Sequence, residues 1–179
     1  MTNIVEVTYS QTGESKKINS FGMRDMQEKA YNARGEQYLL LKAPPASGKS
    51  RALMFIALDK LYHQNINKVI VAVPERSIGG SFGLTDLKKY GFFASWEPNP
   101  IYNLCSVGGE KSKVEAFKKF MASDERVLIC THATLRFAFK ELDEKKFDNC
   151  LLAIDEFHHV SADGENQLGE LLRTLIPNS

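Results

Sequence analysis

The sequence predicts an α/β fold, in which helices cover both faces of a mainly parallel sheet, and three observations support it. Short apolar runs alternate with helical patterns along most of the 179 residues, as in strands joined by crossover helices. Several runs are apolar throughout, which is typical of strands buried on both faces. One run, Tyr38 to Leu41, leads through a loop of small residues into a periodic segment at Arg51 to Leu61.

The elements follow in order from this alternation. The polar lead, residues 1–22, contains the alternating segment Val5 to Tyr9, which can add a strand, and residues 23–179 form one lobe. The other expected strands are Tyr38 to Lys42, Lys68 to Val73, Tyr102 to Val107, Val127 to Cys130 and Cys150 to Ile154. The expected helices are Met23 to Ala33, Ser50 to Tyr62, Ser81 to Tyr90, Ser112 to Met121, Thr134 to Leu142 and Glu165 to Ile176.

Composition indicates a globular, soluble chain. Hydrophobic residues make up 43% and charged residues 25%, which are ordinary values. The net charge of +1 gives no overall attraction to nucleic acid, so a polyanion would need a local surface. Cys105, Cys130 and Cys150 are odd in number and lie in or beside apolar runs, which indicates reduced thiols. Without a signal-peptide pattern or an apolar run near the ~20 residues of a membrane span, we expect a cytoplasmic protein with no membrane partner.

The chemistry of a phosphate-binding loop is carried by Ala43 to Ser50, which read A-P-P-A-S-G-K-S. Ala43 departs from the G-x-x-x-x-G-K-[ST] pattern, but the Gly-Lys-Ser end is kept. Gly48 lets the backbone approach phosphate at a helix N-terminus, Lys49 supplies a cation, and the Ser50 hydroxyl can ligate Mg²⁺. The alternative is a chance turn before a surface helix. The nucleotide-binding stretch that we expect also includes Ala46, Ser47 and Arg51.

A second candidate site follows the apolar run Cys150 to Ile154, which continues into D-E-F-H-H. Acids at the carboxyl end of a parallel strand face the ligand crevice of an α/β sheet. Asp155 would hold Mg²⁺, directly or through water, and Glu156 would orient or deprotonate the water that attacks the γ-phosphate. The alternative is an acidic strand end with no partner, which the upstream loop disfavours. His158 and His159 lack the H-E-x-x-H spacing of a zinc site.

Both stretches resemble the motifs of superfamily 2 helicases and translocases, where motif I reads like A-P-T-G-S-G-K-T and motif II reads D-E-x-H. Pro45 and Ala46 are the visible departures. The resemblance covers residues 23 to 160 and implies the first motor lobe, a three-layer RecA-like P-loop NTPase domain similar to restriction-enzyme type helicase subunits. It implies ATP and Mg²⁺ as ligands, Lys49 and Glu156 as catalytic residues, and Ser50 and Asp155 as metal ligands.

Other segments resemble further motifs of the same family. Residues 24–27 read R-D-M-Q, and by resemblance Gln27 would read adenine; the alternative is an exposed helix glutamine. His158, at the fourth position of motif II, would couple the ATP site to the nucleic acid. Residues 69–77 resemble motif Ia and residues 127–135 resemble the T-x-x-T element. Sequence-independent contacts with the backbone of one nucleic-acid strand would come from Arg76, Ser77, Thr131 and Thr134. The alternative for the two threonines is helix capping.

The resemblance also implies parts that this sequence does not contain. The family uses a second motor lobe, whose arginines stabilise the transferring phosphate, and the residues after Ile176 are too few to form one. No S-A-T-like motif III follows motif II, and the family places the motif III strand between those of motifs I and II. We therefore expect the sheet to lack this strand, and the strands at 38–42 and 150–154 not to pair directly. The N-terminal segment or another molecule's strand would fill the gap.

The leading hypothesis is the ATP-binding lobe of a helicase or translocase that is weakly active or inactive alone. Expected partners are nucleic acid, with DNA favoured over RNA, the second lobe, and restriction or modification subunits. One alternative is a P-loop nucleotide kinase or phosphotransferase, which the Asp-Glu pair and the lack of an Arg-rich lid disfavour; another is a non-catalytic nucleotide-binding module.

Six lysines are interpreted as parts of solvated helix faces and not as a binding stripe. They are Lys111, Lys113, Lys118, Lys119, Lys145 and Lys146.

Overall fold

The computed structural model describes residues 4–8, 18–74, 76–106 and 109–157. The chain divides into two compact units, which are described separately. The first comprises Asn3–Asn65 and Leu84–Glu97, and the second comprises Ile66–Gly83 and Pro98–Ser179. Within the described ranges, no helix combines the length and the apolar character that a membrane crossing requires.

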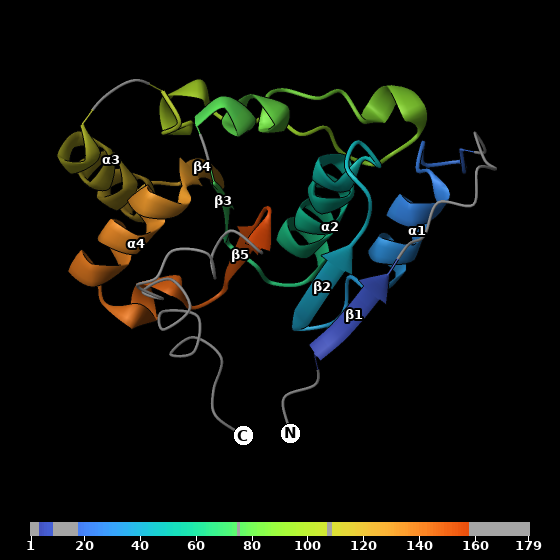
Figure 1. The fold of residues 1–179 in the computed structure, drawn as a ribbon, viewed down its shortest axis with the longest axis horizontal. Coiled ribbons are helices and arrows are strands. Elements are labelled where there is room, and N and C mark those ends of the chain that lie inside the picture. Colours follow the sequence, from blue (N-terminus) through green and yellow to red (C-terminus); the bar gives the residue numbers. More distant parts are fainter. Residues whose placement is uncertain (1–3, 9–17, 75, 107–108, 158–179) are drawn as a thin grey trace. The chain divides into compact units, whose positions relative to one another are not determined.

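The first unit contains two parallel strands and two helices (Figure 1). β1 (Ile4–Thr8) lies parallel to β2 (Tyr38–Lys42) and pairs with it over its full length. α1 (Asp25–Asn32) packs against α2 (Lys49–His63). Two alanines at the contact allow the helices to approach closely. The buried residues of this cluster are Met26, Ala30, Ala52 and Ile56.

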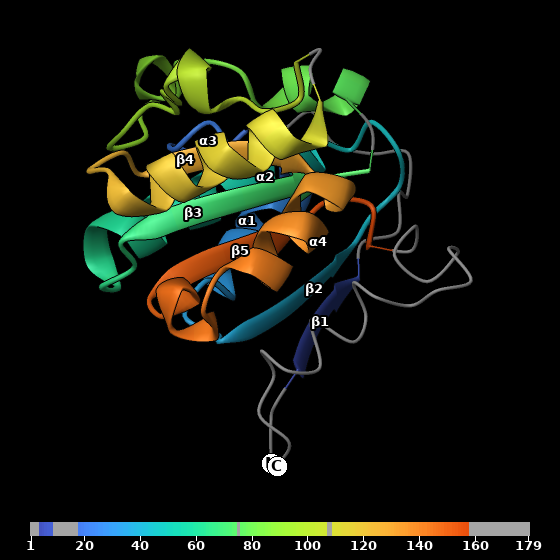
Figure 2. The ribbon, with the colours of Figure 1, turned by 90° about the vertical axis from the view of Figure 1, so that its left-hand side faces the viewer.

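A three-stranded parallel sheet forms the centre of the second unit. β3 (Lys68–Val73) pairs with β4 (Val127–Thr131) on one edge and with β5 (Cys150–Ile154) on the other. α3 (Glu110–Ala122) and α4 (His132–Glu141) lie side by side over one face of this sheet (Figure 2). The buried apolar residues of the cluster that these helices and the sheet form are Ile70, Ala72, Leu104, Phe117, Phe120, Leu128, Cys130, Leu135, Ala138 and Phe147.

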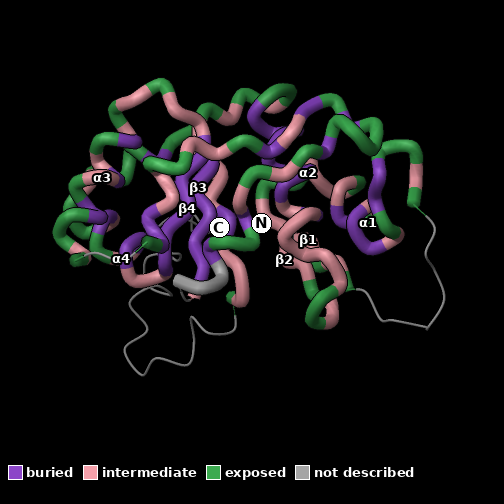
Figure 3. The backbone as a smooth tube through the Cα atoms, turned by 90° about the horizontal axis from the view of Figure 1, so that it is seen from above, coloured by how far each residue is buried: buried purple, intermediate pink, exposed green. Residues whose placement is uncertain are grey.

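The apolar runs of β3 and β4 are uninterrupted because both strands are buried along their length (Figure 3). Val69 to Val73 are all 0% exposed, and every residue of β4 is buried. Each buried apolar Å² contributes about 25 cal/mol, so a polar residue on either face of these strands would be costly. A continuous apolar run is therefore the sequence signature of a strand covered on both sides.

The predicted α/β class with parallel strands is confirmed. The strands at 38–42, 68–73 and 150–154 have the predicted bounds, and the strand from Val127 extends to Thr131. The segment predicted at Val5 to Tyr9 forms β1, and α1 to α4 match four predicted helices to within two residues at each end. The helix predicted at Glu165 to Ile176 lies outside the described residues.

The strand predicted at Tyr102 to Val107 is wrong over its described residues. The chain forms the short 3₁₀ helix η3 (Pro100–Tyr102), and a single bridge then pairs Asn103 with Ile129. The Asn99 side chain accepts a hydrogen bond from the Ile101 N–H at 3.1 Å, which stabilises a turn. Apolar composition alone could not distinguish this turn from a strand.

The helix predicted at Ser81 to Tyr90 is also wrong. Two 3₁₀ helices, η1 (Arg76–Phe82) and η2 (Lys88–Tyr90), are separated by extended chain. Within this extended chain Thr85 exchanges two backbone hydrogen bonds with Trp96, which follows η2, at 2.8 and 2.9 Å. This antiparallel bridge takes up the N–H that a continuous helix would use.

The strands of motif I and motif II belong to different sheets, so they do not pair directly, as expected. β2 pairs with β1, and β5 is an edge strand beside β3. Among the described residues, β1 pairs only with β2. That another strand completes the edge of β5 stays a prediction.

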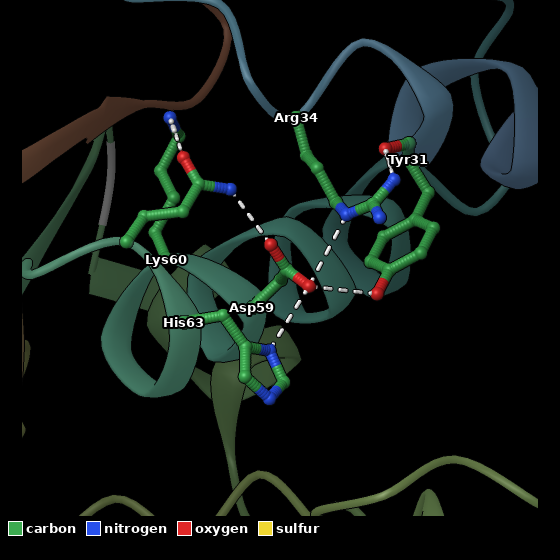
Figure 4. A network of polar contacts seen from close by, with 6 residues as sticks. Tyr31, Arg34, Asp59, Lys60 and His63 are labelled. Carbon is green, nitrogen blue, oxygen red and sulfur yellow. Dashed lines mark hydrogen bonds and ion pairs between the residues drawn. The ribbon is translucent and has the colours of Figure 1, made fainter.

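Asp59 of α2 is the centre of a polar network that fastens the end of α1 (Figure 4). Its carboxylate accepts hydrogen bonds from the Tyr31 hydroxyl at 2.9 Å and the Gln64 amide at 2.7 Å. The Arg34 Nε and the His63 Nδ1 lie 3.1 and 3.2 Å from the same carboxylate. Burial alone would raise the pKa of Asp59, but these hydrogen bonds and the Arg34 charge outweigh it and lower the pKa. Burial and the bond to Asp59 raise the pKa of Tyr31 to about 12.

Two lysines of the second unit differ in their surroundings, since Lys68 is partly buried and Lys113 is buried. The Lys68 Nζ donates to the carbonyls of Phe120, Ser123 and Glu125 at 3.1, 2.7 and 2.8 Å, which caps the end of α3. Lys113 is 5% exposed, so its assignment to a solvated face is wrong. The reason is its spacing from Phe117 and Phe120, which places it on the buried face of α3. Its Nζ lies 3.8 Å from Glu110 and has no hydrogen-bond partner in the described part of the chain.

We predict that Asp59→Asn flattens the acid side of the stability profile. Because the folded pKa lies below the unfolded value of about 3.9, the charged network contributes fully above that value and is lost as pH falls through the folded pKa. Urea unfolding from about pH 7 down to about pH 3 should show a steeper fall in the wild type than in the variant. Asp148→Asn, at an exposed site, should keep the wild-type slope. The same slope in all three proteins would contradict the role of Asp59.

Lys68 and Lys113 should respond differently to the same substitution. Lys68→Met leaves three carbonyls without a charged donor and should lower the free energy of unfolding by about 2 kcal/mol or more. Lys113→Met removes a poorly paired buried charge and should be nearly neutral or stabilising. Urea unfolding at neutral pH measures both. A larger loss in Lys113→Met than in Lys68→Met would show that the contacts of the two ammonium groups have been ranked wrongly.

Candidate functional site

The phosphate-binding loop leaves the carboxyl end of β2 and ends where α2 begins, as the sequence predicts (Figure 1). The Ser47 N–H donates to the Pro44 carbonyl at 3.3 Å, which closes a turn inside the loop. Ala46 and Gly48 have positive φ angles of 59° and 93°. This backbone is accessible to Gly48 but uncommon for alanine. The loop therefore holds some backbone strain at Ala46.

Gln27 fastens this loop to α1. Its side chain is 2% exposed, its Oε1 accepts from the Arg24 N–H at 2.9 Å, and its Nε2 donates to the Gly48 carbonyl at 3.1 Å. The alternative of an exposed helix glutamine is therefore wrong. These bonds use one of the two donor and one of the two acceptor positions of the amide. The reading of adenine by Gln27 stays a prediction.

The start of α2 fits a triphosphate in three ways. No side chain caps the helix at Gly48, so the first N–H groups keep their outward dipoles. The first turn carries Lys49 and Arg51 and no acid. The Ser47 Oγ is buried and has no hydrogen-bond partner among the described residues, which leaves a polar atom for a ligand. Ser50 follows Lys49 at the second position of the helix, where a Mg²⁺-ligating hydroxyl is expected.

Tyr90 is a neighbour of this stretch that no motif or spacing in the sequence predicts. Its ring is 42% exposed, and its centroid lies 5.4 Å from the Arg51 guanidinium and 4.8 Å from the Lys89 Nζ. The Tyr90 side chain packs so closely on Gly22 that a Cβ at Gly22 would lie 2.4 Å from the Tyr90 Cβ. The contact orients Arg51 by cation–π attraction, and it joins segments that no motif connects.

The acid pair lies in the second unit, at the carboxyl end of β5. The Asp155 N–H donates to the Ala72 carbonyl at 2.9 Å, which continues the ladder beyond the strand. The Asp155 Oδ1 accepts from the Glu156 N–H at 3.0 Å. Glu156 has a φ of 50°, which is uncommon for a residue with a Cβ. The chain thus turns sharply at the position expected for catalytic acids.

His132 is a contact of the acid pair that the sequence analysis missed. It is the first residue of α4, and its Nε2 lies 3.0 Å from the Asp155 carbonyl oxygen. Its place between Thr131 and Thr134 was the available signal. The contact brings the T-x-x-T element to motif II.

The first threonine of that element caps α4, and the second connects the start of α4 to α3. Thr131 Oγ1 accepts from the Thr134 N–H at 3.2 Å, and Thr134 Oγ1 donates to a Glu110 carboxylate oxygen at 2.8 Å. Thr131 is 6% exposed and Thr134 is 0% exposed. The capping alternative is confirmed for Thr131. Contact with nucleic acid stays a prediction, and for Thr134 it requires the side chain to become accessible. Glu110, which carries no motif, was missed.

Other predicted site residues are described only in part. Arg76 and Ser77 lie in η1, but their side chains are outside the described part of the chain, and His158 lies outside it altogether. Within the described part, no three His, Cys, Asp or Glu side chains gather as a metal-binding cluster. The Cys130 thiol, next to Thr131, has a pKa raised well above its usual value by burial.

Comparison with known families identifies the family of this chain. A model of the DEAD/DEAH box helicase family matches residues 24–179, which include the Gln27 element, the phosphate-binding loop and the acid pair. The chain belongs to the DEAD/DEAH box helicase family. The DEAD/DEAH box domain has a RecA-like fold and uses ATP and Mg²⁺, so the predicted family, fold and ligands are confirmed.

A relative of this DEAD/DEAH box chain is the candidate ATP-dependent helicase YeeB of Bacillus subtilis (strain 168). The two are 67% identical over 179 residues, which cover 100% of this chain and 30% of the relative. The chain thus spans less than a third of the protein that it matches. No solved structure matches it significantly.

We predict that Gly48→Ala disrupts the loop. Alanine would be held at a φ of 93° with its Cβ 2.5 Å from the Gln27 Nε2, and a left-handed residue costs about 1–2 kcal/mol before any clash. ATP affinity, measured by calorimetric titration, should fall at least roughly tenfold. Gly35→Ala is the matched control, because nothing lies within 4 Å of its Cβ position. An unchanged affinity in Gly48→Ala would contradict the role of the loop.

Proposed function

We propose that this chain is the ATP-binding motor lobe of a longer helicase or translocase, which couples Mg-ATP hydrolysis to movement on nucleic acid. The observation that carries the proposal is the start of α2, where an uncapped helix follows the left-handed Gly48 and the Ser47 hydroxyl is buried without a partner among the described residues. Such a helix start binds phosphate. Membership of the DEAD/DEAH box family supports ATP as the phosphate ligand.

In the first unit, different residues would bind the phosphates, the base and the metal ion of the nucleotide. The N–H groups from Ala46 to Arg51 and the Lys49 cation would bind the phosphates. Gln27 would keep the loop closed from the side of α1 and read the base. The Ser50 hydroxyl would give Mg²⁺ one oxygen ligand.

In the second unit, the acid pair would carry the reaction. Asp155 supplies a carboxylate of the kind that Mg²⁺ prefers, and bound Mg²⁺ would neutralise charge on the phosphate oxygens. Glu156 would accept a proton from the attacking water. Its distorted backbone supports a functional position, because strained residues cluster at active sites.

We propose nucleic acid as the surface on which the motor moves, with DNA favoured over RNA. The resemblance of η1 and of the start of α4 to backbone-binding motifs supports contacts from Arg76, Ser77, Thr131 and Thr134. His158 is proposed as a coupling residue on the same ground. Restriction or modification subunits are proposed partners.

We propose that a second motor lobe lies in another part of the longer protein and completes the ATP site. The relative's greater length supports this, because the chain covers 30% of it. An isolated lobe would then hydrolyse ATP slowly. A cytoplasmic location is supported by three cysteines that are not joined in disulfides.

Glu156→Gln in the full-length protein tests the function directly. The substitution keeps the size of the side chain but removes the base, so kcat for ATP hydrolysis with single-stranded DNA should fall by roughly 100-fold or more. The Kd for ATP should stay unchanged. Glu97→Gln, at an exposed site, is the matched control and should keep the wild-type kcat.

The outcomes separate the competing functions. Unchanged turnover in Glu156→Gln would contradict the catalytic assignment of this residue. A wild-type protein that transfers phosphate to another nucleotide would instead be a kinase. One that binds ATP without hydrolysing it, with or without DNA or RNA, would be a nucleotide-binding module.

A further inference from the structure

The peptide bond between Asp155 and Glu156 is held on both of its sides. Its carbonyl oxygen lies 3.0 Å from the His132 Nε2, and its N–H donates to the Asp155 Oδ1 at 3.0 Å. A carbonyl oxygen can only accept a hydrogen bond, so the His132 Nε2 must carry the proton. His132 is therefore the donor that fixes this peptide plane from outside motif II.

This peptide plane determines where Glu156 points. The preceding N–H, that of Asp155, is bonded to Ala72 in β3 at 2.9 Å, so the chain is anchored just before the turn. Glu156 itself has a φ of 50°, a conformation that persists in residues with a Cβ only when the surroundings hold it. The His132 bond is one of the contacts that hold it.

His132 is in turn fixed by the start of α4. Thr131 caps this helix through the Thr134 N–H, and the Thr134 hydroxyl is bonded to Glu110 of α3. The imidazole therefore has a short and rigid connection to the threonine element. A shift of that element would move the His132 Nε2 relative to the Asp155 carbonyl, and a hydrogen bond weakens steeply with such misalignment.

We infer that His132 is a positioning residue, which orients Glu156 for hydrolysis and transmits to it the state of the threonine element. This inference rests on the proposed function, since it takes Glu156 as the base and the threonine element as the nucleic-acid contact. It adds a coupling contact between the ends of β4 and β5, the two strands that flank β3 in one sheet, independent of His158.

Substitutions that differ only in the reach of an amide test the hydrogen bond. In His132→Gln, the amide nitrogen can take the place of Nε2, whereas in His132→Asn the shorter side chain places it near Nδ1. In the full-length protein with single-stranded DNA, His132→Ala and His132→Asn should lose roughly tenfold to 100-fold in kcat. His132→Gln should keep most of the wild-type kcat. The Kd for ATP should stay within about twofold in every variant, because the inferred role concerns the hydrolysis step and not the binding of the phosphates.

Each result decides the question. Lys140→Ala, at an exposed site on the same helix as His132, is the control and should keep the wild-type kcat. Equal rates in His132→Gln and His132→Asn would overturn the inference, because the role would then not depend on a donor at Nε2. So would a weakened Kd for ATP with unchanged kcat. An inactive wild-type protein would contradict the proposed function instead.

A measurement without turnover tests the contact itself. In full-length protein labelled with ¹⁵N-histidine, NMR should find the proton of His132 on Nε2. A neutral ring that is protonated only on Nδ1 cannot donate to the Asp155 carbonyl and would overturn the inference, whatever the ATPase rate.

Discussion

β3 is the element on which the second unit depends, because it pairs with a parallel strand along each edge. Parallel pairing places the carboxyl ends of all three strands at one edge of the sheet. Thr131 and Asp155 come from strands that are adjacent to β3 but not to each other, and this alignment brings them close enough for His132 to connect them. The burial of β3 on both faces leaves the strand ends as the place for polar chemistry.

In the first unit, the main constraint is to hold a loop with a strained backbone in place. α1 is attached to α2 at two points, through Gln27 at the loop and through the Asp59 network farther along the helix. Small apolar residues pack between these points. The two polar contacts and the apolar packing together restrict the motion of α1 relative to α2 more than either kind of contact would alone. The loop geometry therefore belongs to the helix pair as well as to the loop sequence.

Strands were predicted correctly where an apolar run is also extended, and wrongly where an apolar run follows a turn that a side chain stabilises. Residues 68–73 and 150–154 are apolar and extended, as predicted. The segment from Tyr102 is equally apolar, but the Asn99 side chain stabilises a turn just before it.

Lys113 was predicted to be exposed to solvent, because lysine side chains usually are. Its place on the buried face of α3 overrides that preference.

The sequence by itself determined the α/β class, the phosphate-binding loop and the acid pair, because each depends on residues that are adjacent in the chain. Periodicity and short motifs are local properties, and local sequence contains them fully. Only the tertiary structure decided which distant groups complete the loop and the acids. The bond from Gln27 to Gly48, the ring of Tyr90 under Arg51 and the bond from His132 to Asp155 all join separate segments. Such contacts arise from strand order and helix packing, which no single stretch of sequence contains.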